Sequence, residues 1–168
     1  MHPIGGGAYL PMINALARAG HHVIYFNSRF RGTDSALLME KVVEDLGECV
    51  KDAKNRLGYE KVVLAGWSGG GSLSVFYQQQ AKNPTVTASP SGDGPEIDVP
   101  VLVIGNLADN ACTPSHTMRL FEAIGHPDKE MHEIPGANHY YSRPDQRGAL
   151  RQAVGICTDW LHRHGFSL

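Results

Sequence analysis

The sequence predicts an α/β fold with a mostly parallel sheet flanked by helices. Apolar, β-rich runs alternate along the chain with stretches of helical periodicity, and glycines and prolines separate them. A hydrophobic content of 42% and a charged content of 19% are ordinary for a soluble globular protein. With 168 residues the chain is long enough to bury its own core, so we expect a single domain over residues 1–168.

The first third of the chain contains the first helix, strand and helix of this pattern. A proline at its start and a glycine beyond its end predict a short helix over residues 11–17. Residues 22–26 are rich in β-forming side chains and predict a strand. Apolar residues at helical spacing predict a second helix over residues 38–57, and Gly58 follows as its C-terminal cap.

A single serine stands at the apex of a strand–turn–helix stretch in the middle of the chain. The apolar run 62–65 predicts a buried strand, and Gly66-Trp67-Ser68-Gly69-Gly70 leads from it into a helix that extends to about residue 81. Such a turn exposes the serine hydroxyl at the helix N-terminus, and its glycines are needed where a Cβ would collide. Ser68 is therefore a candidate nucleophile; the alternative is a serine that merely caps a helix.

The second half of the chain begins with a stretch of turn-forming residues. Residues 83–98 are rich in proline, glycine and polar side chains and poor in core residues, so they predict a loop. Strands are predicted over 99–105 and 130–134, with a helix over 113–124 between them. Apolar residues at helical spacing then predict a last helix around residues 150–161.

Composition disfavours several classes of function. A formal net charge of -2 gives no reason to expect nucleic acid or an anionic membrane as partner. No apolar run approaches the roughly 18–20 residues that span a bilayer, and no signal-peptide pattern opens the chain. The three cysteines are widely spaced and lack a C-x-x-C pair, which favours reduced thiols in a cytoplasmic protein. Gly5-Gly6-Gly7 lacks the lysine of a phosphate-binding loop and the full dinucleotide fingerprint, so we expect no cofactor. His162 and His164 are two positions apart on a helix and diverge, so we expect no metal there.

Three reactive side chains follow the ends of three different predicted strands. Ser68 follows the strand 62–65, while Asp109 and His139 follow the next two strands. Ligands of parallel sheets gather at the carboxyl ends of the strands, so we expect the three side chains to meet there. Histidine can take the proton of a serine that attacks a substrate, and aspartate can orient the imidazole. Asp93 and Asp98 precede a strand and are expected at the opposite end.

The oxyanion of a tetrahedral intermediate needs preorganised N–H donors. The backbone N–H of Gly69 is one candidate, directly after the nucleophile. The glycine-rich loop near the N-terminus is the expected source of the second donor. Since Pro3 has no N–H, the candidates there are Ile4 and Gly5.

With these motifs the chain resembles the α/β-hydrolases over most of residues 2–165. His2-Pro3-Ile4-Gly5-Gly6-Gly7 takes the place of the family's oxyanion loop, and the serine, aspartate and histidine follow in the family's order. The resemblance implies hydrolysis of carboxylic esters, thioesters or amides without a cofactor. We expect a small-molecule ester substrate, cleaved through an acyl-enzyme.

The chain departs from the family pattern in two places. Only Met1 precedes the oxyanion loop, where the family has a strand, and the loop 83–98 stands where a strand and a cap are usual. We therefore expect a reduced hydrolase core, shortened at the N-terminus and in the cap region. Exposed strand edges would favour a homo-oligomer. The alternative function is a weakly active or inactive hydrolase-derived fragment that acts by self-association or partner binding.

Overall fold

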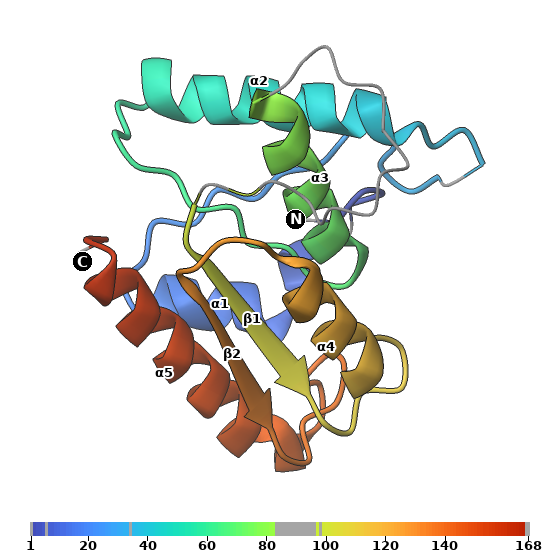
Figure 1. The fold of residues 1–168 in the computed structure, drawn as a ribbon, viewed down its shortest axis with the longest axis vertical. Coiled ribbons are helices and arrows are strands. Elements are labelled where there is room, and N and C mark those ends of the chain that lie inside the picture. The colour runs from blue at the N-terminus through green and yellow to red at the C-terminus, as the bar shows by residue number, and fades with distance from the viewer. Residues whose placement is uncertain (1, 6, 34, 83–96, 98, 167–168) are drawn as a thin grey trace. The chain divides into compact units, whose positions relative to one another are not determined.

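The computed structural model of the protein describes residues 2–5, 7–33, 35–82, 97 and 99–166 (Figure 1). The chain divides into two compact units: Met1–Gly7 with Tyr25–Ile97, and Ala8–Ile24 with Asp98–Leu168. The elements in chain order are η1 (Gly7–Tyr9), α1 (Pro11–Arg18), α2 (Met39–Asn55), α3 (Gly69–Lys82), β1 (Val101–Asn106), α4 (Pro114–Ala123), β2 (Lys129–Ile134), η2 (Pro144–Gln146) and α5 (Arg147–Arg163).

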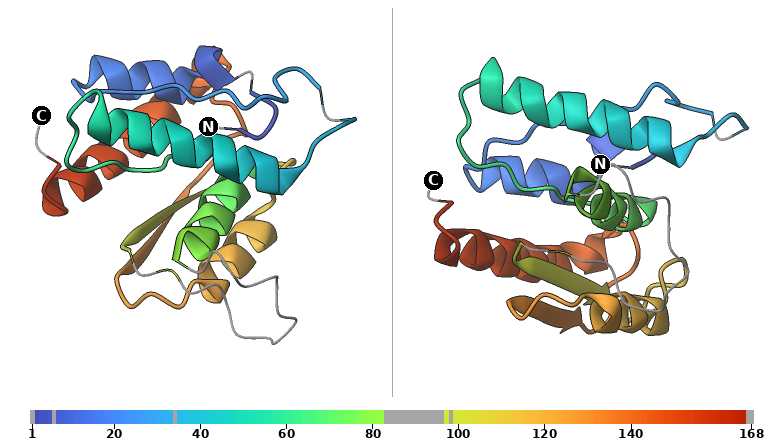
Figure 2. Two further views of the ribbon diagram at one scale, coloured as in Figure 1. Left: turned by 90° about the horizontal axis from the view of Figure 1, so that it is seen from above. Right: turned by 45° about the horizontal axis from the view of Figure 1, so that its top comes forward.

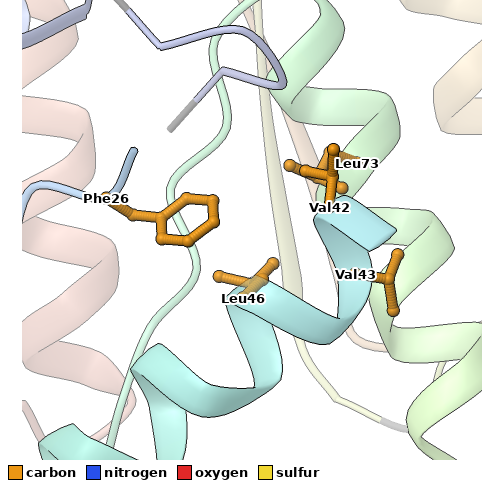
Figure 3. Close-up of a cluster of buried hydrophobic side chains, with 5 residues drawn as sticks. All are labelled: Phe26, Val42, Val43, Leu46 and Leu73. Carbon is orange, nitrogen blue, oxygen red and sulfur yellow. The ribbon is translucent and has the colours of Figure 1, made fainter. Parts of the chain in front are cut away.

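The first unit is built on α2 and α3, which pack across one another (Figure 2). Residues 42, 43 and 46 are apolar and share one face of α2, because three and four positions separate neighbours on a helix. That face forms a buried cluster with one residue of α3 and one of the extended run before α2 (Figure 3). The cluster consists of Phe26, Val42, Val43, Leu46 and Leu73.

The second unit contains a parallel two-stranded sheet with helices beside it. β1 pairs with β2 from Val101 opposite Lys129 to Asn106 opposite Ile134. Helices α4 and α5 contact these strands, and α1 lies along α5 (Figures 1 and 2). Since the strands are parallel and in register, their carboxyl ends meet, and the loops after Asn106 and Ile134 start side by side.

The predicted helices are confirmed to within a few residues. The strands predicted over 99–105 and 130–134 are confirmed as β1 and β2, also to within a few residues. The apolar pattern of α2 overestimated its length, because Leu38 and Leu57 lie outside the helix and are exposed. In the part of the chain that the structure describes, no helix is long and apolar enough to cross a membrane.

Two predicted strands are not formed in the described part of the chain. Residues 22–26 and 62–65 lie outside the helices and pair with no strand. Among the described residues, only β1 and β2 form a β-ladder. A β-rich sequence becomes a strand only where a neighbouring backbone completes its hydrogen bonds, which single-segment patterns do not reveal. The predicted loop 83–98 lies outside the described residues except for Ile97, which is buried. One domain over residues 1–168 stays a prediction.

Candidate active site

Asp109 sits in a tight turn directly after β1. Its N–H donates to the carbonyl oxygen of Asn106, at 3.1 Å. The backbone N–H groups of Ala111 and Cys112 both donate to Asp109 Oδ1, each at 2.8 Å. These bonds are typical of an aspartate that closes a turn with its own side chain. They fix the carboxylate so that Oδ2 remains for a second partner.

That partner is His139, in the loop after β2. His139 Nδ1 lies 2.6 Å from Asp109 Oδ2, and the two residues are only 7% and 8% exposed. An ionised carboxylate can only accept hydrogen bonds, so Nδ1 carries the hydrogen and Nε2 is the basic nitrogen of the ring. The ring of Tyr140 meets the imidazole edge-on, with 4.6 Å between centroids. The second unit therefore brings together two of the three residues predicted for catalysis.

The two loops that carry this pair are joined by their backbones. Leu107 N–H donates to the carbonyl of Ile134 at 3.1 Å, which continues the sheet beyond β1. Ala108 N–H then donates to the carbonyl of Ala137 at 2.9 Å. The aspartate and histidine loops consequently leave the sheet as one hydrogen-bonded layer, which sets the distance between Asp109 and His139.

Two buried amide side chains, those of Asn106 and Gln146, lie beside the pair and were not predicted from the sequence. Asn106 and Gln146 are 8% and 5% exposed, and both bond to the backbone of Asn138, directly before His139. The signal for Asn106 was a polar residue at the end of an otherwise apolar strand. Gln146 carries no comparable signal, because it lies among other polar residues.

Ser68 lies in the first unit, in the turn before α3. Its φ angle is +54°, in the left-handed region that non-glycine residues rarely adopt, at a cost of about 1–3 kcal/mol. The turn is closed by bonds from Gly70 N–H to the carbonyl of Trp67, at 2.7 Å, and from Gly71 N–H to that of Ser68, at 2.9 Å. Helix α3 begins at Gly69. The predicted strained turn at a helix N-terminus is therefore present, without a ladder-paired strand before it.

The predicted oxyanion loop adjoins this turn within the same unit. A Cβ built on Gly69 would lie 3.6 Å from both His2 Nε2 and Pro3 Cδ. The loop is also held by Ser28, whose buried hydroxyl donates to the carbonyl of Pro3. Gly5 has a φ of +75°, and a Cβ there would lie 2.6 Å from Asn27 Oδ1. The backbone angle therefore favours glycine here, and a larger residue would also have to displace the Asn27 side chain.

The hydrogen bonds of this loop distinguish between the candidate oxyanion donors. Gly5 N–H already donates to the carbonyl of His2, at 3.0 Å. Ile4 N–H makes no hydrogen bond to a described residue, and its carbonyl accepts from Gly32 N–H at 2.9 Å. Gly69, as the first residue of α3, has no acceptor for its N–H within the helix. Of the two loop candidates, Gly5 N–H is thus already engaged, and the identity of the oxyanion donors stays a prediction.

The six predicted site residues are thus divided between the units. Asp109 and His139 meet in the second unit, and Ser68 lies with Gly69 and the oxyanion loop in the first. Their assembly into one triad stays a prediction. Among the described residues, no three His, Cys, Asp or Glu side chains are grouped as a metal site.

Comparisons with known proteins identify the fold. A family model described as the alpha/beta hydrolase fold matches residues 2–88, which is more than half of the chain. No curated protein matches the sequence significantly. Among solved structures, the chain is similar to the monoacylglycerol lipase of Paleococcus ferrophilus, with a TM-score of 0.62 and 18% sequence identity. That match covers 92% of this chain and 91% of the lipase chain.

Proposed function

Since the chain belongs to the α/β-hydrolase family, a family of hydrolases, we propose that it cleaves carboxylic esters as a serine hydrolase. Ser68 is the nucleophile, His139 the general base and Asp109 the residue that orients the imidazole. The proposal includes the meeting of Ser68 with His139 at one site. It needs no cofactor or metal ion, because serine, histidine and backbone N–H groups supply the nucleophile, the proton transfer and the charge stabilisation.

The observation that carries the proposal is the buried hydrogen bond between His139 Nδ1 and Asp109 Oδ2. A surface histidine gains little from such a bond. A histidine base in a hydrolase needs it, because the aspartate fixes the tautomer with Nε2 unprotonated and stabilises the imidazolium that forms. The left-handed backbone of Ser68 adds independent support, since such strain concentrates at functional positions.

The reaction follows from these roles. Ser68 Oγ attacks the ester carbonyl while His139 Nε2 takes the hydroxyl proton. The carbonyl oxygen becomes an oxyanion, which accepts hydrogen bonds from the N–H groups of Gly69 and Ile4. Collapse of the intermediate expels the alcohol, which receives the proton from His139, and leaves an ester on Ser68. Water then attacks this acyl-enzyme by the same route and releases the carboxylic acid.

The test is covalent labelling by a fluorophosphonate, read by intact-mass spectrometry. The reagent phosphonylates an activated serine with loss of fluoride, so the native protein should gain one adduct. Ser68→Ala should gain none. Ser72→Ala is the matched control, because Ser72 is an exposed serine on the same helix, and it should label like the native protein.

His139→Ala should retain Ser68 but label far more slowly, because no base takes the proton. Hydrolysis of p-nitrophenyl acetate and butyrate by the same variants then tests ester specificity. Absence of an adduct on folded native protein, or an adduct that persists in folded Ser68→Ala, would refute the assignment of the nucleophile.

Self-association is the second candidate function. In the described part of the chain, β1 pairs only with β2, and such edges can pair with another copy of the chain. Mass measurement by light scattering distinguishes the two candidates. A stable oligomer that forms no fluorophosphonate adduct favours this role, whereas a labelled monomer rejects it.

We also propose a cytoplasmic location. No disulfide joins Cys49, Cys112 and Cys157, and cysteines stay reduced most readily in a reducing compartment. Fractionation of the native source cells, followed by immunodetection of the protein, tests this. Recovery in a membrane or extracellular fraction would contradict it.

A further inference from the structure

The backbone of Asn138, directly before His139, is held by two buried amide side chains. Asn106 Nδ2 donates to the carbonyl oxygen of Asn138 at 2.9 Å, and Asn138 N–H donates to Gln146 Oε1 at 2.8 Å. Gln146 Nε2 also donates to the carbonyl of Gly136, at 3.1 Å. Each amide therefore uses its side chain to fix the backbone of the histidine loop. Asn106 reaches it from the end of β1, and Gln146 from the turn before α5.

Tyr141 fixes the orientation of the first amide. Its hydroxyl donates to Asn106 Oδ1 at 2.6 Å, and both residues are buried. Burial raises the pKa of Tyr141 to about 12, so the hydroxyl keeps its proton and remains a donor at neutral pH. With Oδ1 held in this way, Nδ2 of Asn106 must face Asn138. Tyr141 has a φ of +50°, so the loop bends sharply just after His139.

The histidine loop is thereby held on both sides of His139, through the backbone of Asn138 and the side chain of Tyr141. Asn138 is fixed before it by Asn106 and Gln146, and Tyr141 is fixed after it by the same Asn106. Asn106 also accepts the N–H of Asp109 on its backbone carbonyl. Asn106 thus contacts both the turn that carries Asp109 and the loop that carries His139, so it fixes the position of one relative to the other.

We propose that Asn106 and Gln146, with Tyr141 as the residue that orients Asn106, are positioning residues that hold the His139 imidazole against Asp109. Their role in catalysis rests on the proposed hydrolase function. Asn106 and Gln146 bond to the backbone of the histidine loop, and Tyr141 bonds to Asn106. They act by restricting the loop to the conformation in which Nδ1 meets the aspartate, so that Nε2 is presented as a base.

The test observes the His139 ring itself by NMR on protein labelled with ¹⁵N-histidine. The Nδ1–H proton bonded to Asp109 is assigned by its loss in His139→Gln, and its exchange with solvent is measured. In the native protein this exchange should be slow. In Asn106→Ala and in the near-isosteric Gln146→Met it should be faster by about tenfold or more, because each variant removes two hydrogen bonds and the loss of one buried hydrogen bond alone produces about a tenfold effect.

Lys129→Met is the matched control. Lys129 Nζ donates to the carbonyls of Phe121 and Ile124, so the variant also removes hydrogen bonds from the second unit. These lie at the amino end of β2, opposite the end that carries His139. In Lys129→Met the Nδ1–H proton of His139 should exchange at the native rate, even if the Tm of this variant is as low as the Tm of Asn106→Ala.

If Asn106→Ala does not fold, Tyr141→Phe decides, because it removes one hydroxyl and keeps the ring. Its Nδ1–H should also exchange faster. The positioning role would be overturned if the Nδ1–H proton exchanged at the native rate in folded Asn106→Ala and Gln146→Met. It would also be overturned if exchange in Lys129→Met were as fast as in those two variants.

Fluorophosphonate labelling of the same samples keeps the two proposals apart. Faster exchange in the variants of a protein that never labels supports the positioning role and rejects the hydrolase.

Discussion

A Cβ atom built on Gly66 would lie 2.1 Å from the carbonyl oxygen of Gly70. Real Cβ atoms do not approach backbone atoms so closely. The carbonyl oxygen of Gly70 belongs to the backbone, so it cannot move aside as the end of a flexible side chain could. The turn that carries Ser68 therefore brings the chain back against itself so tightly that only a hydrogen fits at position 66. The backbone of the turn, and with it the position of the serine, depends on this contact.

Gly66→Ala should therefore lower the free energy of unfolding by about 3 kcal/mol or more, among the larger effects of single substitutions. Gly71→Ala is the control, because a Cβ there meets no atom within 4 Å and the residue lies in α3. Alanine is the better helix former, so that variant should be neutral or gain about 0.5–1 kcal/mol. Urea unfolding of both variants measures the difference. Equal stability of the two would contradict the steric argument.

Asp109→Asn should abolish most of the reactivity of Ser68 while the protein stays folded. Asparagine can present its amide hydrogen to His139 Nδ1, which favours the wrong tautomer, and the same change in a serine protease costs about four orders of magnitude. The second-order rate of fluorophosphonate labelling measures the effect. Asp128→Asn is the control, since Asp128 Oδ2 lies 3.2 Å from His164 Nε2 in a second, more exposed Asp–His pair. A native labelling rate in Asp109→Asn would remove Asp109 from the proposed triad.

Much of this architecture could be predicted from the sequence because local chemistry dictates it. The helical spacing of Val42 and Leu46 marks the buried face of α2 without knowledge of its partner. The Gly-x-Ser-x-Gly pattern around Ser68 predicts a tight turn, and at Gly66 a Cβ would collide with the backbone of Gly70. Asp109 and His139 could be paired in advance because each follows a strand, and parallel strands end at one edge.

What could not be predicted depends on contacts between distant residues. The runs 22–26 and 62–65 have strand-like composition but join no ladder in the described part of the chain, because pairing is decided by the neighbouring backbone. Asn106 and Gln146 are polar residues whose importance lies in burial beside Asn138. Asn106 is marked in the sequence only as a polar residue at the end of an apolar strand, and Gln146 lies among other polar residues, so it is the fold that reveals what each amide binds.

The ion pair between Arg163 and Glu130 should make stability depend on acid pH. Arg163 Nη1 and Nη2 lie 2.6 and 2.8 Å from the two carboxylate oxygens, and these bonds lower the pKa of Glu130 to about 2. A carboxyl whose pKa is lower in the folded state stabilises the protein above its unfolded pKa. The contribution of Glu130 should therefore be complete above about pH 5 and lost as the pH falls towards 2.

The comparison of native protein with Glu130→Gln isolates this contribution. The native protein should be the more stable at pH 7, and the difference should shrink steadily in urea titrations between pH 5 and the acid limit. Glu133→Gln, an exposed position on the same strand, should show no such trend. A difference that stays constant with pH would mean that the pair does not lower the pKa of Glu130 in solution.

Ser28→Ala should slow the chemistry at Ser68 without weakening the first binding of the reagent. The Ser28 hydroxyl donates to the carbonyl of Pro3, and the next N–H in the chain, that of Ile4, is the proposed second oxyanion donor. Loss of this buried hydrogen bond loosens the loop, and an oxyanion donor acts mainly on the transition state. We expect the maximal rate of fluorophosphonate labelling to fall about tenfold while the concentration for half-maximal rate stays constant.

Ser35→Ala is the control, because Ser35 is an exposed serine in the following loop, and this variant should retain both values. An unchanged maximal rate in Ser28→Ala would show that the Pro3 anchor is not needed to position Ile4.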